Sequence, residues 1–344
     1  MRVRAAWFGL FVLATVPVSA AAQAPSVGEV FKKVIPSVAV IRARGREVST
    51  RTDSVSRLKD TGSGVLISAD GKVMTAAHVV HAMAEITVEF LGSDPVSGRV
   101  ISSEPAADVS IIQLERVPPR ARAASMGDSS KVAIGDRVIV VGAPYGLSYA
   151  LSAGLISARY APNTVYQAFP LAEFFQTDAA INTGSSGGPM FDMAGQVIGI
   201  VSHFISKSGG SEGLGFVVTV DSARENLLQR RAFWKGLEVY PVTGSLADAL
   251  NLPPKTEGLM VKSVAKGSPA DEAGLRAGAL PATIDGREMI LGGDIILEVG
   301  PIVASGPDAY LKIRSYVNSL SPNTSFKIKL LRAGEVLEIS MRVR

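Results

Sequence analysis

Two adjacent serines inside a run of glycines are the residues of this sequence best suited to chemistry. Ser185 and Ser186 occupy the middle of the segment GSSGG at residues 184–188. Glycine allows tight turns that residues with a Cβ atom resist. Such a turn can expose one hydroxyl and aim successive backbone N–H groups at one point, as a serine nucleophile and its oxyanion require. Taken alone, the segment is more typical of a surface loop, so its assignment depends on the rest of the chain.

A serine becomes a strong nucleophile when a histidine, usually oriented by a carboxylate, removes its proton. The chain has three histidines. His78 follows a strand-like segment and a turn, whereas His81 comes one helical turn later and is interpreted as a solvated helix residue. Asp108 precedes an apolar segment and lies between His78 and Ser186 in the chain. The resulting order of His, Asp and Ser predicts a catalytic triad.

Residues 184–188 also fit the G-x-S-x-G nucleophile elbow of α/β-hydrolases, in which the acid and then the histidine follow the serine. His203 is the histidine that follows Ser186, and it does so after 17 residues. This interval is too short for an intervening strand, helix and acid. The chymotrypsin order of catalytic residues is therefore favoured.

Four segments occur in a fixed order: TAAHVV at residues 75–80, ADVSIIQLE at 107–115, QTDAAINTGSSGGPM at 176–190 and EGLGFVVTVD at 212–221. Together they resemble the HtrA (DegP/DegS-like) serine proteases, and the resemblance runs from about Val27 to the C-terminus. It implies a mainly β, chymotrypsin-like double β-barrel with Ser186 as nucleophile, His78 as general base and Asp108 as its orienting partner. The N–H groups of Gly184 and Ser186 would form the oxyanion hole around Ser185, which stands where the family usually has Asn.

The same resemblance implies the substrate-binding residues. The S1 pocket would be lined by Ala180, Ile181, Ile200, Val201, Ser202, His203 and Phe204. This lining is apolar and carries no carboxylate, so burying a lysine or arginine side chain there would be costly. We therefore expect cleavage after small or apolar residues. Asp178 is close in sequence, but the corresponding residue of the family faces elsewhere.

Composition and charge are those of a globular protein large enough for two domains. The 344 residues are 47% apolar and 19% charged, and the net charge is +4. Removing residues 1–22 removes two arginines and no acid, which leaves 4 − 2 = +2. This weak charge, without a basic stripe interleaved with aromatic residues, argues against nucleic-acid binding. The sequence has no cysteine for disulfides or lipoprotein attachment, and nothing in it suggests a metal or organic cofactor.

The first 22 residues have the pattern of a secretory signal peptide. Two arginines precede an apolar stretch, and small residues at 19–22 offer a cleavage site. The apolar stretch is shorter than the about 20 residues that span a membrane comfortably, although an uncleaved anchor stays an alternative. Export and the protease resemblance together predict a periplasmic protein.

Residues 23–235 are expected to form the protease domain. Short apolar runs separated by Gly, Asp, Ser and Pro predict the strands of a β-barrel domain. The other elements expected in this domain are a helix at 27–36, an exposed mobile loop at 43–61, and a closing helix at 221–235 capped by Asp221 or Ser222.

Residues 236–344 are expected to form a second domain, similar to the PDZ domain of HtrA proteins. PDZ domains add an extended peptide to a sheet edge and hold its C-terminal carboxylate on backbone N–H groups. Residues 279–293 depart from the family pattern, and the sequence leaves open whether this insertion obstructs the groove. Ser268 and Pro269 predict the start of a short helix. The carboxylate loop and binding strand are placed at Gly236, Leu237, Glu238 and Val239.

Two functions from different classes fit these observations. The first is an ATP-independent serine-type endopeptidase of periplasmic protein quality control, which cleaves unfolded or misfolded proteins and binds peptide C-termini at its PDZ domain. The second is a peptide-binding chaperone or scaffold with a weak or idle protease site. A complete set of His78, Asp108 and Ser186 favours the first. The resemblance also implies a homotrimer or a larger multiple.

Overall fold

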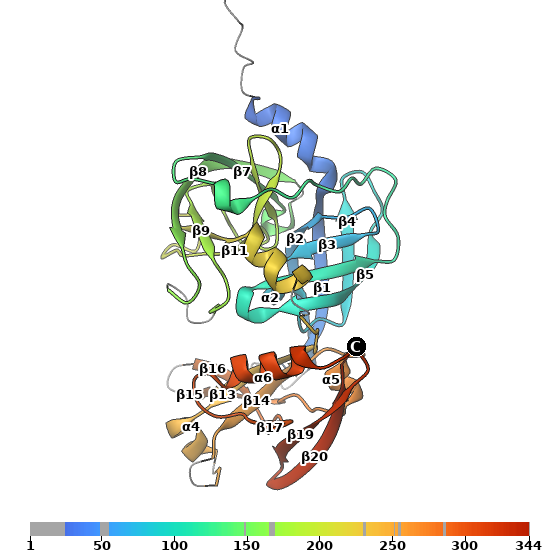
Figure 1. The fold of residues 1–344 in the computed structure, drawn as a ribbon, viewed down its shortest axis with the longest axis vertical. Helices are drawn as coiled ribbons and strands as arrows, with labels where there is room; N and C mark the ends of the chain where they lie inside the picture. Colours follow the sequence, from blue (N-terminus) through green and yellow to red (C-terminus); the bar gives the residue numbers. More distant parts are fainter. Residues whose placement is uncertain are drawn as a thin grey trace, which may run out of the picture.

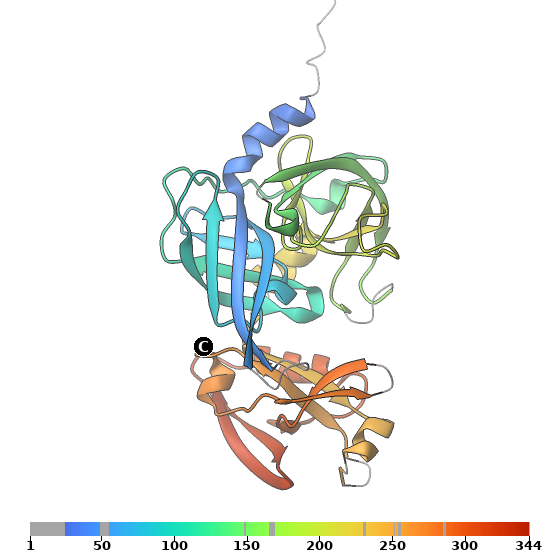
Figure 2. The same cartoon turned by 180° about the vertical axis from the view of Figure 1, so that it is seen from behind.

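The computed structural model describes residues 25–48, 55–147, 149–164, 169–229, 232–250, 252–253, 256–284 and 287–343. The signal peptide expected at residues 1–22 lies outside these ranges. Two β-barrels lie side by side, and a smaller unit of sheet and helices lies below them (Figure 1). Helix α1 (Val27–Val34) is at the opposite end of the molecule from this unit, as Figure 2 shows from behind.

The first barrel is a closed antiparallel sheet in the strand order β1–β2–β3–β6–β5–β4. Its interior includes Ile41, Val73, Val88, Phe90 and Ile112, all of which are buried. The short helix α2 (Ala77–Val80) follows β3, and the 3-10 turn η2 (Pro105–Ala107) precedes β6. The strands are β1 (Val38–Val48), β2 (Val55–Leu66), β3 (Lys72–Thr75), β4 (Glu85–Phe90), β5 (Val96–Glu104) and β6 (Val109–Leu114).

The second barrel is closed in the order β10–β11–β12–β9–β8–β7 and is filled by apolar side chains such as Phe175, Met190 and Val217. The pair of closed barrels confirms the predicted mainly β, chymotrypsin-like architecture. Its strands are β7 (Arg137–Gly142), β8 (Ala150–Tyr160), β9 (Phe174–Thr177), β10 (Pro189–Asp192), β11 (Val197–Phe204) and β12 (Gly215–Thr219). Three further 3-10 turns are η1 (Ile35–Ser37), η3 (Ser129–Lys131) and η4 (Pro144–Gly146).

A shared apolar cluster joins the two barrels to α1. It contains Val34 from α1, Val65 from the first barrel and Phe191 from the second barrel. The helix begins with a capping box, in which the side chains of Ser26 and Glu29 each accept from the other's backbone N–H. The helix predicted at 27–36 is thus confirmed, and it covers the line where the barrels meet.

The prediction of an exposed loop at residues 43–61 is wrong for the described residues, because β1 and β2 pair up to Val48 and Val55. The segment is polar, but it alternates with a period of two: Ala43 is buried, whereas Arg42 and Arg44 are exposed. Backbone pairing does not depend on apolar side chains on the outer face. From residue 41 to residue 45 every second residue is buried, and the arginines between them give the segment the polar composition of a loop.

The closing helix is shorter than predicted. Helix α3 (Val220–Arg224) continues as a π-helical turn η5 (Glu225–Gln229), and Thr219 rather than Asp221 or Ser222 is its N-cap. Phe233, which the prediction placed in this helix, instead forms an isolated antiparallel bridge with Ser102 of β5. Tertiary contacts with the first barrel therefore replace the last turns of the predicted helix.

The C-terminal unit is an antiparallel sheet in the order β13–β14–β17–β19–β20, with β18 added to β17. The short helix predicted after Ser268 is present, and the Ser268 hydroxyl accepts from Asp271 N–H at 3.2 Å. The elements are β13 (Leu237–Val242), β14 (Gly258–Val264), β17 (Ile295–Val299), β18 (Ile302–Val303), β19 (Ser325–Arg332), β20 (Glu335–Arg342), α4 (Gly244–Ala249), α5 (Pro269–Glu272) and α6 (Ala309–Ser319).

The insertion at residues 279–293 forms a two-stranded hairpin of β15 (Leu280–Ile284) and β16 (Arg287–Leu291). Ile290 of this hairpin is buried, and its neighbours pack on an apolar cluster near α4. A narrow cavity of about 60 Å³ lies instead between β13 and α6, and none of the residues that line it belongs to the hairpin. The described part of the insertion therefore leaves this cavity uncovered.

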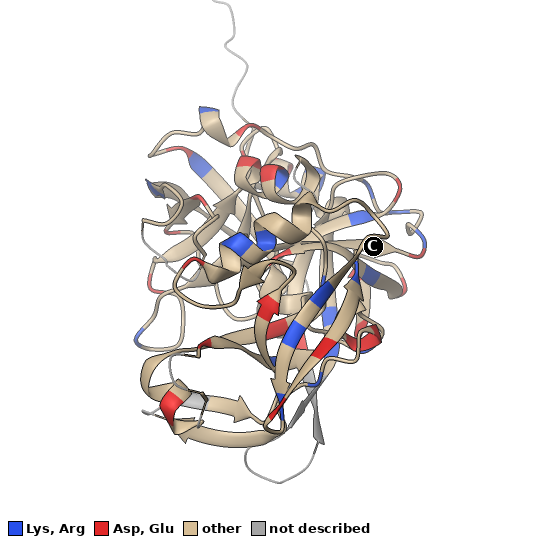
Figure 3. Ribbon diagram, turned by 60° about the horizontal axis from the view of Figure 1, so that its bottom comes forward, with Lys and Arg blue, Asp and Glu red and all other residues tan. Residues whose placement is uncertain are grey.

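Charged side chains of both signs are interspersed over the ribbon in Figure 3. This distribution agrees with the weak net charge of the sequence. Among the described residues, no helix is long and apolar enough to cross a membrane.

Candidate active site

His78 and Asp108 meet at the edge of the first barrel. His78 lies on α2 directly after β3, and Asp108 ends η2 with a left-handed φ of 51°, which aspartate tolerates better than most residues. The His78 Nδ1 atom lies 2.9 and 3.1 Å from the two carboxylate oxygens, and the His78 backbone N–H donates to Oδ1 at 3.1 Å. The carboxylate is buried, whereas 43% of the His78 side chain is exposed. This geometry fixes the ring with Nε2 free to act as a base.

The electrostatics of the pair suit a general base. Burial alone would lower the pKa of His78, but the charge and hydrogen bonds of Asp108 raise it above the ordinary value of 6.5. Asp60 and Glu238 add smaller contributions in the same direction. The His78 ring is therefore made more basic by its carboxylate partner.

Ser202 of β11 gives Asp108 a second partner from the other barrel. Its hydroxyl donates to Asp108 Oδ2, and it lies 2.9 Å from His203 Nδ1. The sequence places Ser202 in the substrate strand and does not show this contact with Asp108. The position of Ser202 directly after the apolar residues 197–201 is the sequence feature that could have pointed to a buried, hydrogen-bonded serine.

The Ser186 hydroxyl donates to the Ser202 carbonyl at 3.0 Å. The hydroxyl thus donates to β11, and this hydrogen bond must break before the hydroxyl can donate to His78. Catalytic hydrogen bonds are often formed only when substrate is bound. Ser186 and Asp108 both contact Ser202, so the structure brings the three predicted residues together at the junction of the barrels.

Hydrogen bonds fix the peptide bonds before Ser186. These are Tyr145 N–H to the Thr183 carbonyl at 2.7 Å, Ser63 Oγ–H to the Gly184 carbonyl at 2.8 Å, and Gly188 N–H to the Ser185 carbonyl at 2.9 Å. The C=O and N–H of a planar trans peptide point in opposite directions. The Gly184 N–H is therefore directed away from Tyr145, and the Ser186 N–H is directed away from Gly188.

The turn depends on glycine at position 184. Gly184 has a φ of +94°, and a Cβ atom there would lie 2.4 Å from the Ala143 carbonyl. Ser185, at the position of the family's usual Asn, is buried and held within the same turn. Its N–H donates to the Asn182 carbonyl at 2.9 Å, and its hydroxyl accepts from Asn182 N–H at 3.4 Å. Ser185 thus stabilises the turn through its own hydrogen bonds to Asn182.

The predicted S1 residues fall into two groups. Ile181, Ile200 and Val201 are buried in the apolar clusters around the second barrel, so their side chains face the core. Ala180 is exposed, and Phe204 and His203 are half-buried. Asp178 accepts from Leu155 N–H at 2.6 Å, and this bond directs its carboxylate to β8.

His203 is set among aromatic rings. It stacks on Phe216 with 5.2 Å between ring centroids, and Phe169 and Phe174 each lie 5.7 Å away. Burial lowers its pKa from the ordinary value, while the charge of Asp108 opposes this change. His203 therefore contributes an apolar stacking surface beside the acid.

The prediction that His81 is solvated is wrong. Its side chain is buried between the first barrel and the C-terminal unit, with Nδ1 2.7 Å from the Ser103 hydroxyl and Nε2 2.9 Å from the Leu237 carbonyl. Burial lowers its pKa to about 4. The helical spacing was correct, but β13 covers the face of α2 that the sequence left exposed.

The four residues predicted to bind a peptide C-terminus lie at the start of β13. Leu237 and Val239 line the cavity beside α6, together with Ile313 and Val317. Gly236 is buried, whereas the Glu238 carboxylate turns aside and accepts from the Ser263 hydroxyl at 2.9 Å. β13 pairs with β14 on one side, so its other side forms the edge of the sheet.

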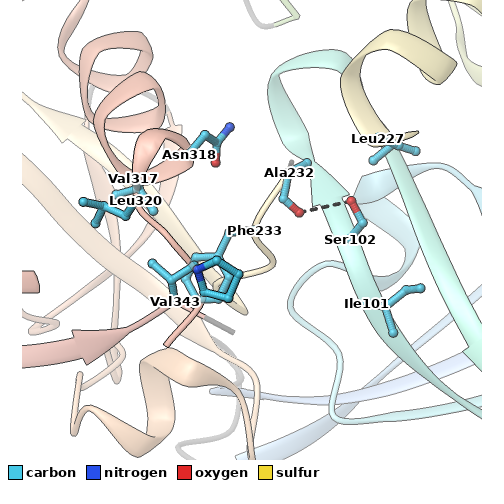
Figure 4. Close-up of a pocket in the computed structure, with 10 residues that line it drawn as sticks. Ile101, Ser102, Leu227, Ala232, Phe233, Val317, Asn318, Leu320 and Val343 are labelled. Atoms are coloured by element: carbon cyan, nitrogen blue, oxygen red, sulfur yellow. Dashed lines mark hydrogen bonds between the residues drawn. The ribbon is translucent and has the colours of Figure 1, made fainter. Parts of the chain in front are cut away.

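Charged groups join the barrels to the C-terminal unit. Arg314 of α6 pairs with the buried Glu104 of β5, and it also donates to Asn226 Oδ1 at 3.2 Å. Burial lowers the pKa of Lys235, while the charge of Glu104 opposes this change. A cavity of about 250 Å³ lies beside these groups, between β5 and the end of α6 (Figure 4). Within the described ranges, no three His, Asp or Glu side chains gather as a metal site.

Comparisons with known sequences agree with the geometry. Residues 62–200 match the family of trypsin-like peptidase domains. A protein of Hahella chejuensis named "Probable periplasmic serine endoprotease DegP-like" is 32% identical over 295 residues, which cover 83% of this chain and 57% of that protein. A protein of the same name from Pseudomonas putida is 33% identical over 275 residues, which cover 77% and 55%. The matched part of the chain thus spans little more than half the length of these relatives.

Solved structures of an HtrA-type protease, AlgW, are also similar. AlgW with a decapeptide has a TM-score of 0.53 and 26% identity, and the match covers 93% of this chain and 98% of that chain. AlgW with a tripeptide has a TM-score of 0.52 and 27% identity, with coverage of 93% and 97%. The similarity therefore includes the C-terminal unit as well as the barrels.

Proposed function

We propose that this chain, which belongs to the HtrA family of serine proteases, is a periplasmic serine endopeptidase that cleaves unfolded or misfolded proteins. The observation that carries the proposal is the His78 ring held on the buried Asp108 carboxylate, which Ser202 links to Ser186. The periplasmic location rests on the predicted signal peptide and on the names of the relatives.

In the proposed mechanism, the Ser186 hydroxyl leaves the Ser202 carbonyl and donates to His78 Nε2. His78 takes the proton as Oγ attacks the scissile carbonyl, and Asp108 stabilises the imidazolium that forms. The N–H groups of Gly184 and Ser186 bind the oxyanion. His78 then gives its proton to the leaving amine, and water releases the acyl group from Ser186 by the same steps in reverse.

The C-terminal unit is proposed to be a PDZ domain that binds peptide C-termini at the edge of β13. The cavity between β13 and α6 supports this role, because an apolar side chain of an added strand would fit there. The peptide-bound AlgW structures support it by similarity. By resemblance to the family, we propose a homotrimer or a larger multiple and cleavage after small or apolar residues.

A specific observation favours a second candidate function, a scaffold with an idle site: the Ser186 hydroxyl is bonded to Ser202 rather than turned to His78. Casein cleavage by the purified mature protein distinguishes the two functions. We expect cleavage that Ser186→Ala and His78→Ala each abolish, while the double variant is little worse than either because triad members act as a unit.

Ser211→Ala is a matched control, since it removes a hydroxyl from an adjacent loop. We expect it to keep measurable turnover. A folded wild-type protein that neither cleaves casein nor reacts with a fluorophosphonate probe, even with a peptide present, would favour the scaffold.

A further inference from the structure

Ser63 is a buried polar residue that neither the sequence motifs nor the proposed triad uses. It lies in β2 of the first barrel and is fully buried. Its hydroxyl donates to the Gly184 carbonyl at 2.8 Å and accepts from Ala143 N–H at 2.9 Å. One side chain of the first barrel thus satisfies two backbone groups of the second barrel.

The backbone of Ser63 belongs to the same network. Its N–H donates to the Ser186 carbonyl at 2.8 Å, and its carbonyl accepts from the Thr75 hydroxyl at 2.7 Å. Ser63 therefore contacts the residues on both sides of Ser185. Since β2 is part of a closed barrel, these contacts tie the nucleophile turn to a rigid frame.

The surroundings leave little room for the turn to move. A Cβ atom at Gly142 would lie 2.9 Å from the Ser63 hydroxyl, and one at Gly188 would lie 3.1 Å from Ser63 Cβ. Ala143, which donates to the Ser63 hydroxyl, is followed two residues later by Tyr145, which donates to the Thr183 carbonyl. Ser63 thus contacts the Gly184–Ser185 peptide directly, and it supports the Thr183–Gly184 peptide through the segment from Ala143 to Tyr145.

We infer that Ser63 is a positioning residue for the oxyanion hole, acting through the Gly184 carbonyl and the Ala143 N–H. This inference rests on the proposed protease function. Without the hydroxyl, the Gly184 carbonyl and the Ala143 N–H lose their partner in a buried place, which favours rotation of the Gly184–Ser185 peptide. This peptide lies between the Gly184 and Ser186 N–H groups, so its rotation would shift the two groups relative to each other while leaving His78 and Asp108 in place.

The test compares Ser63→Ala with Ser37→Ala, a matched control that removes another buried hydroxyl, whose hydrogen bond goes to the Val34 carbonyl of α1 rather than to the nucleophile turn. Loss of one oxyanion donor lowers rates about 100- to 1,000-fold, so loss of its support is expected to lower kcat roughly 10- to 100-fold. KM and the pH at which activity rises should stay unchanged, because His78 is not affected. Fluorophosphonate labelling of Ser186 should slow by the same factor.

Ser63→Cys keeps a weaker donor on the same Cβ atom and should label at an intermediate rate. It serves as the second variant if Ser63→Ala does not fold. Labelling of Ser63→Ala within twofold of the wild type, or an equal loss in Ser37→Ala, would overturn the inference.

Crystal structures of the two alanine variants separate this inference from the proposed function. The role of Ser63 is supported if the Gly184 carbonyl has turned from its present direction in Ser63→Ala but not in Ser37→Ala. An unchanged Gly184–Ser185 peptide overturns it. This comparison of structures does not require protease activity. Failure of the proposed function is seen separately, as a wild-type protein that neither cleaves casein nor reacts with the fluorophosphonate probe.

Discussion

The molecule has two interfaces of opposite chemical character. Between the barrels, at the candidate site, most contacts are hydroxyls and backbone groups packed against glycines, with Ser63 at the centre, and Ser202 also donates to the buried Asp108 carboxylate. Between the barrels and the C-terminal unit, the contacts include the buried pair of Glu104 and Arg314 and the buried His81. We therefore expect the free energy of unfolding to depend on side-chain shape at the first interface and on side-chain charge at the second.

The largest effect is expected where the barrel interface is most crowded. A Cβ atom at Gly187 would lie 2.1 Å from the Thr75 hydroxyl and 2.3 Å from the Ser63 carbonyl, and Gly187 has a left-handed φ of 82°. Gly187→Ala should therefore destabilise the protein by roughly 3–5 kcal/mol and abolish activity. Urea unfolding and casein cleavage measure both effects. Gly209→Ala is the control, since it has a similar φ and open space around it.

Gly209→Ala should lose about 1 kcal/mol from backbone strain and keep its activity. Equal losses of stability in the two variants would show that crowding at the barrel interface has no separate effect.

The next largest effect is expected from the charged interface. Glu104→Gln keeps the shape of the side chain but leaves Arg314 buried without its partner, which should cost about 3 kcal/mol or more. Trp234, which donates to the His81 carbonyl at 2.8 Å, is the single tryptophan after residue 22 and reports on this interface by fluorescence during urea unfolding.

The double variant Glu104→Gln with Arg314→Met should regain much of the lost stability, because neither charge is then left alone. A double variant as unstable as the sum of both single changes would contradict this account of the interface.

The smallest effect is a dependence on pH. His81 has a folded pKa of about 4, below the ordinary 6.5, so the unfolded chain binds a proton in the range where the folded protein does not. The stability that the depressed pKa of His81 contributes is therefore fully present above pH 6.5. Below pH 6.5 the free energy of unfolding falls, by about 3 kcal/mol near pH 4. His81→Gln retains an N–H donor and cannot titrate, so its stability should fall less steeply over this range.

The difference between wild type and His81→Gln isolates His81 from the other titrating groups. Parallel stability curves for the two proteins between pH 7 and pH 4 would contradict the assignment of a buried, neutral His81.

The sequence predicted what depends on neighbours along the chain, such as the helix capped by Ser26 and the short helix after Ser268. The His–Asp–Ser order also led to residues that the structure brings together. The roles of His81, Ser63 and the Glu104–Arg314 pair cannot be predicted from the sequence, because their partners lie 156, 121 and 210 residues away. No local pattern distinguishes the buried Ser63, which lies between two glycines, from a serine at a strand surface.

The division of the site between the barrels has a consequence for how the chain matures. His78 and Asp108 belong to the first barrel and Ser186 to the second, and the bonds that join them, from Ser63 and Ser202, span 121 and 94 residues. Contacts of such long range form late in folding, since a large loop must close before they are made. Under the proposed mechanism, a newly made chain therefore carries its serine without a base until both barrels have docked, and a half-folded copy would be unable to cleave other chains.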